Sequence, residues 1–186
     1  MKDKIFIIDY LENYKKALLE TDVSENMIAA KTLLLKIQQN GKKVIIVGNG
    51  GSAAMASHVC VDLTKQAGIR AVNFNEADLI TCFANDYGYE NWAAKAIEFY
   101  GDEGDVAILI SSSGKSHNMI NAAVQARSML IPVITLTGFE QDNPLRQFGE
   151  LNFWVDSRAY NVIENIHQIW LLMVCDLILG KIEYSA

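Results

Sequence analysis

Proline and cysteine are both scarce in this chain. Its 186 residues include only two prolines and three cysteines, Cys60, Cys82 and Cys175. Because no linker rich in proline or serine divides the sequence, we expect a single domain over residues 1–186. The cysteines are odd in number, widely spaced and free of any CxxC pair, which argues against a disulfide framework or a cysteine zinc site. Reduced thiols of this kind are typical of the cytoplasm, where we expect the protein to be.

Long apolar runs and clusters of positive charge are also missing. The apolar stretch at residues 5–8 is too short for the core of a signal peptide. The longest one, residues 169–179, is interrupted by Asp176, whereas a membrane span needs about 20 apolar residues. The formal net charge is −6 and no run of Lys or Arg occurs, so a nucleic-acid backbone has no cationic patch to bind. We therefore expect direct contact with neither membrane nor nucleic acid.

Short apolar runs alternate with stretches of helical periodicity. Runs of about five apolar residues suggest strands buried on both faces, as in a parallel sheet. This alternation predicts an α/β fold with helices on both faces of the sheet. Two leading helices are expected within residues 1–40, and the α/β core with a C-terminal helix within 41–186. The predicted strands are 44–47, 106–110, 133–136 and a weaker one at 153–155; the predicted core helices are 53–66, 92–100, 119–130 and 162–179.

Two small polar loops follow two of the predicted strands, and each precedes a predicted helix. In such sheets, ligands bind beyond the carboxyl ends of the strands, so both loops should meet at one rim. Backbone N–H groups at a helix N-terminus and serine hydroxyls suit the oxygens of a phosphate monoester. Either loop alone could equally be a plain strand-to-helix turn. The candidate ligand contacts are Asn49, Gly50, Gly51, Ser52, Ser111, Ser112, Ser113 and Ser116.

Several motifs, in this order, resemble the SIS-domain phosphoheptose isomerases. They are GNGGSAA at 48–54, ANDYG at 84–88, GDVAILISSSGKS at 104–116 and ITLTG at 134–138. The resemblance implies a five-stranded parallel sheet flanked by helices (the SIS domain), and a homotetramer with active sites at subunit interfaces. It also implies an aldose–ketose isomerase that interconverts sedoheptulose 7-phosphate and a heptose 7-phosphate for lipopolysaccharide synthesis. No nucleotide cofactor is expected.

The resemblance also assigns roles to individual residues. The phosphate contacts it implies are the hydroxyls of Ser52, Ser111, Ser112, Ser113 and Ser116. Asn49 and Asp86 would face the sugar.

The catalytic positions depart from the family pattern. The family's carboxylate base is a Glu four residues after a helix His, and here Asp62 follows His58 at that spacing. A catalytic His of the last helix is replaced by Leu172, and a metal-binding Gln of that helix by Glu164. The resemblance thus implies Asp62 and Glu164 as the catalytic groups, with His167 as another candidate for the second proton transfer. It also allows a zinc ion held by His58, Asp62 and Glu164.

Two further functions remain open at this point. One relative in the family keeps the fold and tetramer without catalytic groups and binds the replication initiator protein DnaA. Leu172 favours such a regulatory binding protein. Asp62, Glu164 and the loop at residues 111–116, which we call the serine loop, favour phosphosugar chemistry. A third option is an isomerase of another phosphosugar, with Glu164 or His167 as the second group.

Overall fold

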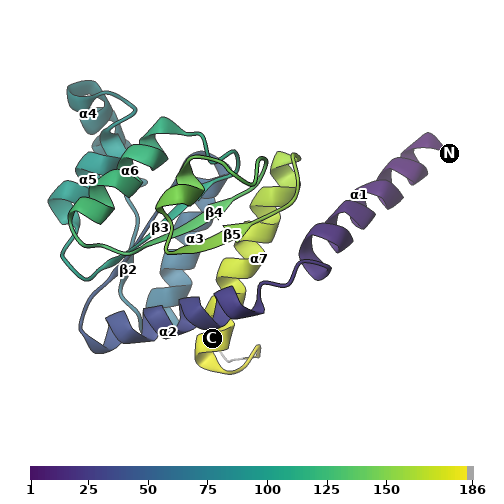
Figure 1. The fold of residues 1–186 in the computed structure, drawn as a ribbon, viewed down its shortest axis with the longest axis horizontal. Coiled ribbons are helices and arrows are strands. Elements are labelled where there is room, and N and C mark those ends of the chain that lie inside the picture. The colour runs from purple at the N-terminus through teal and green to yellow at the C-terminus, as the bar shows by residue number, and fades with distance from the viewer. Residues whose placement is uncertain (184–186) are drawn as a thin grey trace.

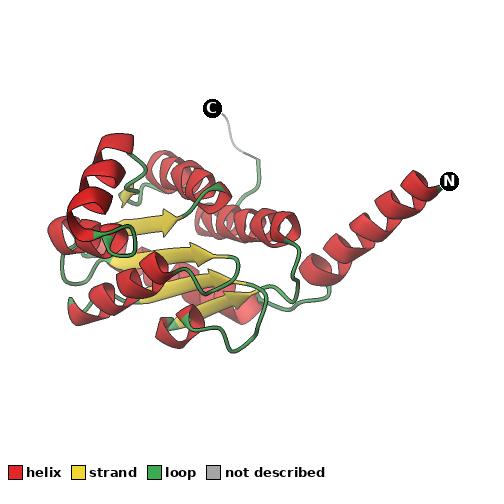
Figure 2. Ribbon diagram, turned by 90° about the horizontal axis from the view of Figure 1, so that it is seen from above, coloured by secondary structure: helices red, strands yellow, loops and turns green. Residues whose placement is uncertain are grey.

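The protein is an α/β domain with one parallel sheet between two layers of helices, which confirms the predicted fold. The computed structural model describes residues 1–183, and the strand order is β2-β1-β3-β4-β5 (Figures 1 and 2). Neighbouring strands are parallel throughout. The strands are β1 (Val44–Gly48), β2 (Ala71–Val72), β3 (Val106–Ser111), β4 (Val133–Thr137) and β5 (Leu151–Trp154).

Helices α2, α3 and α7 cover one face of the sheet, and α5 and α6 cover the other. The predicted core helices are all present, with ends shifted by a few residues. Two elements were not predicted, the short edge strand β2 and the helix α4. The helices are α1 (Lys2–Leu19), α2 (Ser24–Gln39), α3 (Gly51–Lys65), α4 (Ala77–Tyr87), α5 (Trp92–Tyr100), α6 (His117–Ser128) and α7 (Tyr160–Leu179), with a 3-10 turn at Leu145–Phe148.

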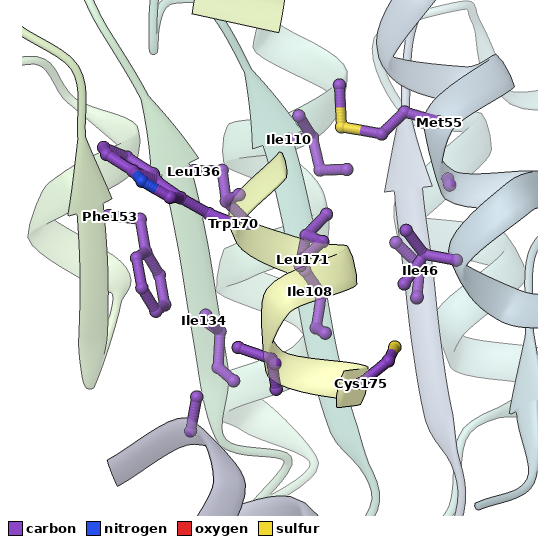
Figure 3. Close-up of a cluster of buried hydrophobic side chains, with 14 of the residues drawn as sticks. Ile46, Met55, Ile108, Ile110, Ile134, Leu136, Phe153, Trp170, Leu171 and Cys175 are labelled. Atoms are coloured by element: carbon purple, nitrogen blue, oxygen red, sulfur yellow. The ribbon is translucent and has the colours of Figure 1, made fainter. Parts of the chain in front are cut away.

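The main core lies between the sheet and α7 (Figure 3). Alternate residues of a strand point to opposite faces, so Ile108 and Ile110 of β3 reach the α7 side together. There they join Trp170 and Leu171 of α7, all of them at most 5% exposed. Burying these apolar groups fixes α7 across the strands and so sets where its first turn lies relative to the strand ends.

Helix α7 is, within residues 1–183, the one helix long and apolar enough by length and composition to cross a membrane. Eight of its side chains are buried, among them Trp170 and Val174. A helix that packs its apolar side chains against a sheet fits the prediction of a buried core helix.

Helix α1 projects away from the body of the domain (Figures 1 and 2). Its N-terminal half exposes large apolar side chains, including Ile5, Phe6 and Ile8. Its C-terminal half is attached to the start of α7. There, the Tyr14 hydroxyl donates to the Asn161 carbonyl at 3.1 Å and accepts from Asn165 Nδ2 at 2.7 Å.

Candidate functional site

The two predicted loops lie side by side at the carboxyl edge of the sheet. Their strands are neighbours, with Gly48 of β1 opposite Ile110 of β3 in the register. The loops surround a cavity of about 120 Å³, which we call the serine cavity. It is lined by Asn49, Ser52, Ile110, Ser111, Ser112, Ser113, Ser116, Tyr160 and Glu164. Six of the eight ligand contacts predicted in these loops therefore share one cavity, and the other two, Gly50 and Gly51, belong to the loop that forms its wall.

Glycine is needed in the first loop because of backbone conformation. Gly50 has a φ of +55°, which side-chain-bearing residues rarely adopt. At Gly51, the absence of a Cβ leaves room for the carboxylate of Glu164 on α7, which a larger residue would displace. Glu164 thus lies beside the start of α3, where it also lines the serine cavity.

The serine loop holds one hydroxyl that has no partner. The Ser111 hydroxyl donates to Ser116 Oγ at 3.2 Å, and Ser113 Oγ accepts the Lys115 backbone N–H. Ser112 is only 6% exposed, yet its Oγ has no hydrogen-bond partner in the described chain. A buried hydroxyl without a partner costs free energy, which a ligand oxygen in the cavity would recover.

The two predicted catalytic carboxylates lie far apart along α3. Glu164 contacts Gly51, the first residue of that helix, and Asp62 lies eleven positions later. At a rise of 1.5 Å per residue, this separation is about 16 Å along the helix axis. Within one chain, Asp62 and Glu164 therefore do not face a common substrate atom, although the sequence reading had paired them.

The three predicted metal ligands are not brought together either. His58 Nε2 lies 3.6 Å from Asp62 Oδ2, and His58 Nδ1 is 3.1 Å from Nε2 of Gln168. Glu164 lies one turn before Gln168 on α7, beside Gly51 rather than His58. Residues 1–183 contain no group of three or more His, Cys, Asp or Glu side chains placed to hold a metal ion. The donor set of a single chain therefore does not fit zinc.

His167 and Leu172 do not reach the serine cavity. His167 is fully buried and its Nε2 donates to the Thr137 carbonyl at 3.0 Å, at the end of β4. Burial lowers the pKa of this imidazole to about 4, because desolvation penalises the charged form more than the Thr137 carbonyl favours it. Leu172 lines a separate, largely apolar groove of about 660 Å³ along the outer side of α7. His167 thus has a structural role here and is excluded as the second proton-transfer group.

Asp86 is exposed near the end of α4 and does not line the serine cavity. Its carboxylate accepts from the neighbouring Asn85 amide at 2.9 Å and lies 3.8 Å from Cys82 Sγ. Its contact with the sugar stays a prediction.

Three residues at the site were missed by the sequence reading. Tyr160, in the first turn of α7, lines the serine cavity, while Asn118 and Tyr89 both hydrogen-bond to Asn49. Asn118 follows Ser116 by two residues, so its place in the first turn of a helix was visible in the sequence. Tyr89 and Tyr160 reach the site through packing of distant segments, which no local pattern indicates.

Comparison with known proteins identifies the family. Residues 8–138 match the model of the SIS domain. The chain is 35% identical over 157 residues to the phosphoheptose isomerase of Colwellia psychrerythraea, covering 80% of each chain. It is 34% identical to that of Fusobacterium nucleatum over 155 residues, covering 81% of this chain and 77% of the relative.

Solved structures agree with the sequence matches. A phosphoheptose isomerase from Francisella tularensis superposes with a TM-score of 0.89 at 27% identity, covering 97% of this chain and all of the other. Phosphoheptose isomerase GmhA from Neisseria gonorrhoeae gives a TM-score of 0.85, also at 27% identity and with the same coverage. With the family model covering well over half of its length, the chain belongs to the SIS-domain family and, within it, to the phosphoheptose isomerases.

Proposed function

We propose that this protein is an aldose–ketose isomerase that interconverts sedoheptulose 7-phosphate and a heptose 7-phosphate. The observation that carries the proposal is the serine cavity, a hydroxyl-lined hollow at the strand ends of a phosphoheptose isomerase fold. By the family resemblance, the product would enter lipopolysaccharide synthesis in the cytoplasm.

The serine cavity is the phosphate site in this proposal. Ser52, Ser113 and Ser116 offer hydroxyls, and Ser112 adds the buried hydroxyl that has no partner. Ser52 lies in the first turn of α3, and Ser116 directly precedes α6, so two helix N-termini point their partial positive charge toward the site. These groups can hold a phosphate dianion despite the negative net charge of the protein.

The isomerisation moves one proton between neighbouring carbons through an enediol. A base removes the proton from C1 of the ketose, the carbonyl oxygen at C2 takes up a proton, and the enediol is reprotonated at C2 while O1 becomes the carbonyl. Asp62 is the proposed base, because a carboxylate of suitable reach can hold and return the same proton. It is one methylene shorter than the family's Glu, which reduces its reach by about 1.5 Å.

Glu164 cannot assist this Asp62 within one chain, because about 16 Å of α3 separates them. We propose that a second copy of the chain completes the active site in a homotetramer, as the family resemblance implies. The exposed apolar side chains of α1 and the apolar groove of α7 support this assembly.

A non-catalytic DnaA-binding role is not favoured. The similar proteins named above are isomerases, and the serine cavity keeps a complete set of phosphate-binding groups. A regulatory protein without a phosphosugar ligand would need neither the serine hydroxyls nor Asp62.

The proposal is tested by turnover. Purified protein is incubated with sedoheptulose 7-phosphate, and formation of heptose 7-phosphate is followed by NMR with and without added zinc. In deuterated water, exchange of one carbon-bound hydrogen at C1 or C2 would show the enediol route. Absence of both turnover and exchange, with the phosphosugar bound, would contradict the isomerase function.

A further inference from the structure

A pair of asparagines connects the loop that follows β1 (residues 48–52) to the first turn of α6. Asn49 Nδ2 donates to Asn118 Oδ1 at 3.1 Å, and Asn118 Nδ2 donates back to Asn49 Oδ1 at 2.8 Å. The Tyr89 hydroxyl adds a third hydrogen bond, to Asn49 Oδ1 at 3.2 Å. Asn118 is only 3% exposed, so its half of the pair is held rigidly by the surrounding protein.

These bonds use most of the hydrogen-bonding capacity of Asn49. A carboxamide has two N–H donors and an oxygen with two lone pairs. Both lone pairs of Asn49 Oδ1 are engaged, by Asn118 and by Tyr89, and so is one of its N–H groups. One N–H of Asn49 remains, and Asn49 lines the serine cavity.

From this arrangement we propose that Asn118, assisted by Tyr89, is a positioning residue for the phosphosugar. It holds the Asn49 carboxamide in one orientation, so that Asn49 meets the ligand as a donor to an acceptor oxygen. The inference rests on the proposed function, since it assigns the way in which that same site recognises its ligand.

The location of Asn118 links this role to phosphate binding. Ser116 lines the serine cavity, and Asn118 follows it by two residues in the same helical turn. The N-terminal end of α6, with its capping residue Ser116, thus contributes a hydroxyl to the cavity and holds the Asn49 side chain of the other loop. The two loops come from different strands, so the asparagine pair sets their spacing at the site.

The chain supplies a matched control for this residue. Asn121 lies one turn further along α6 and also donates two hydrogen bonds to another segment, to the Glu90 carbonyl at 2.9 Å and to Asn91 Oδ1 at 3.0 Å. It does not line the serine cavity. Asn121→Ala therefore removes a bridging amide of the same helix that makes no hydrogen bond to Asn49.

The test is a double-mutant cycle on ligand affinity. Dissociation constants for sedoheptulose 7-phosphate are measured by calorimetry for wild type, Asn118→Ala, Asn49→Ala, the double variant and Asn121→Ala. We expect Asn118→Ala to weaken binding about tenfold and Asn121→Ala less than about twofold. In the Asn49→Ala background, Asn118→Ala should have almost no further effect, because the group it positions is gone. Tyr89→Phe, at an exposed position, should weaken binding about threefold without altering thermal stability.

The outcomes separate this inference from the proposed function. Additive effects of Asn118→Ala and Asn49→Ala, or equal effects of Asn118→Ala and Asn121→Ala, would overturn the positioning role while phosphosugar binding stands. A wild-type protein that binds no sugar phosphate would overturn both. If Asn118→Ala fails to fold, Tyr89→Phe with and without Asn49→Ala provides the same cycle.

Discussion

Ser113 and Ser116 contribute hydroxyls to the serine cavity, and their removal tests the phosphate site most directly. A ligand that binds only the folded state raises its stability by about 2.7 kcal/mol at a hundredfold excess over Kd. We expect sedoheptulose 7-phosphate to raise the melting temperature of the wild type. The melting temperature of the Ser113→Ala/Ser116→Ala variant should not change when the sugar is added. Ser128→Ala, at the far end of α6, is the control and should keep the shift. An undiminished shift in the double variant would mean that the ligand binds elsewhere.

Asp62 is the residue on which turnover should depend. Losing a general base typically costs about 10²–10⁴ in rate with little effect on binding. We expect Asp62→Asn to reduce kcat by that factor, while the thermal shift with phosphosugar persists. Asp78→Asn, on α4, should leave kcat unchanged. Full activity of Asp62→Asn would exclude Asp62 as the base.

By the family resemblance, Leu172 takes the place of a proton-transferring His. Leucine cannot exchange protons, so this site should limit the rate of the natural chain. Leu172→His combined with Asp62→Glu should raise kcat above that of wild type, measured by NMR. Leu172→Gln is the control, because it adds a polar group of similar size without an acid–base function. Equal rates for the His and Gln variants would show that position 172 does not participate in proton transfer.

His167 should make the stability of the protein depend on pH. Its pKa is lowered from 6.5 to about 4 in the folded state, so between these values the unfolded chain binds more protons and stability falls as pH falls. The free energy of unfolding should decrease by about 2 kcal/mol from pH 7 to pH 5 on account of this residue. Urea titrations at both values should show a smaller decrease for His167→Leu than for wild type. An identical pH dependence in that variant would contradict the assignment.

The N-terminal half of α1 exposes large apolar side chains within residues 1–183. Ile5 and Ile8 are 54% and 51% exposed, one helical turn apart. We expect Ile5→Ser/Ile8→Ser to weaken assembly, seen by light scattering over a dilution series, while the circular dichroism spectrum of the domain stays the same. Lys4→Ser/Lys15→Ser is the control and should leave the assembly intact. Unaltered assembly in the Ile5/Ile8 variant would show that this half of α1 lies outside the interface.

The two elements that were not predicted from the sequence, β2 and α4, are both weakly buried. β2 is two residues long and only half-buried, so Ala71 and Val72 lack the fully apolar run that marks the other strands. α4 buries none of its side chains completely, although Leu79, Ile80 and Phe83 have helical spacing. β5 was predicted only weakly, at residues 153–155, and Phe153 is the one fully buried residue among its four. The fully buried strands β1, β3 and β4 gave clear apolar runs, whereas weak burial hid β2 and α4.

We propose that the molecule is a homotetramer, because the predicted catalytic residues Asp62 and Glu164 do not meet within a single chain. The sequence placed both polar loops at one rim correctly, because parallel neighbouring strands end at the same edge. The sequence prediction also grouped Glu164 with His58 and Asp62. In the structure Glu164 lies near the other end of α3, because its position depends on how α7 packs, and local sequence spacing does not determine that packing. Their roles, and the fourfold assembly, stay predictions.

Successive residues at the start of α7 contact two different neighbours. Tyr160 and Glu164 line the serine cavity, whereas the backbone carbonyl of Asn161 and the side chain of Asn165 hydrogen-bond to the Tyr14 hydroxyl of α1. With 18 residues, α1 is about 27 Å long. The hydrogen bonds that attach this long helix to α7 lie one residue away from the side chains that line the serine cavity. In the proposed tetramer, a neighbouring subunit bound to the exposed half of α1 would therefore contact a helix that is hydrogen-bonded next to the serine cavity.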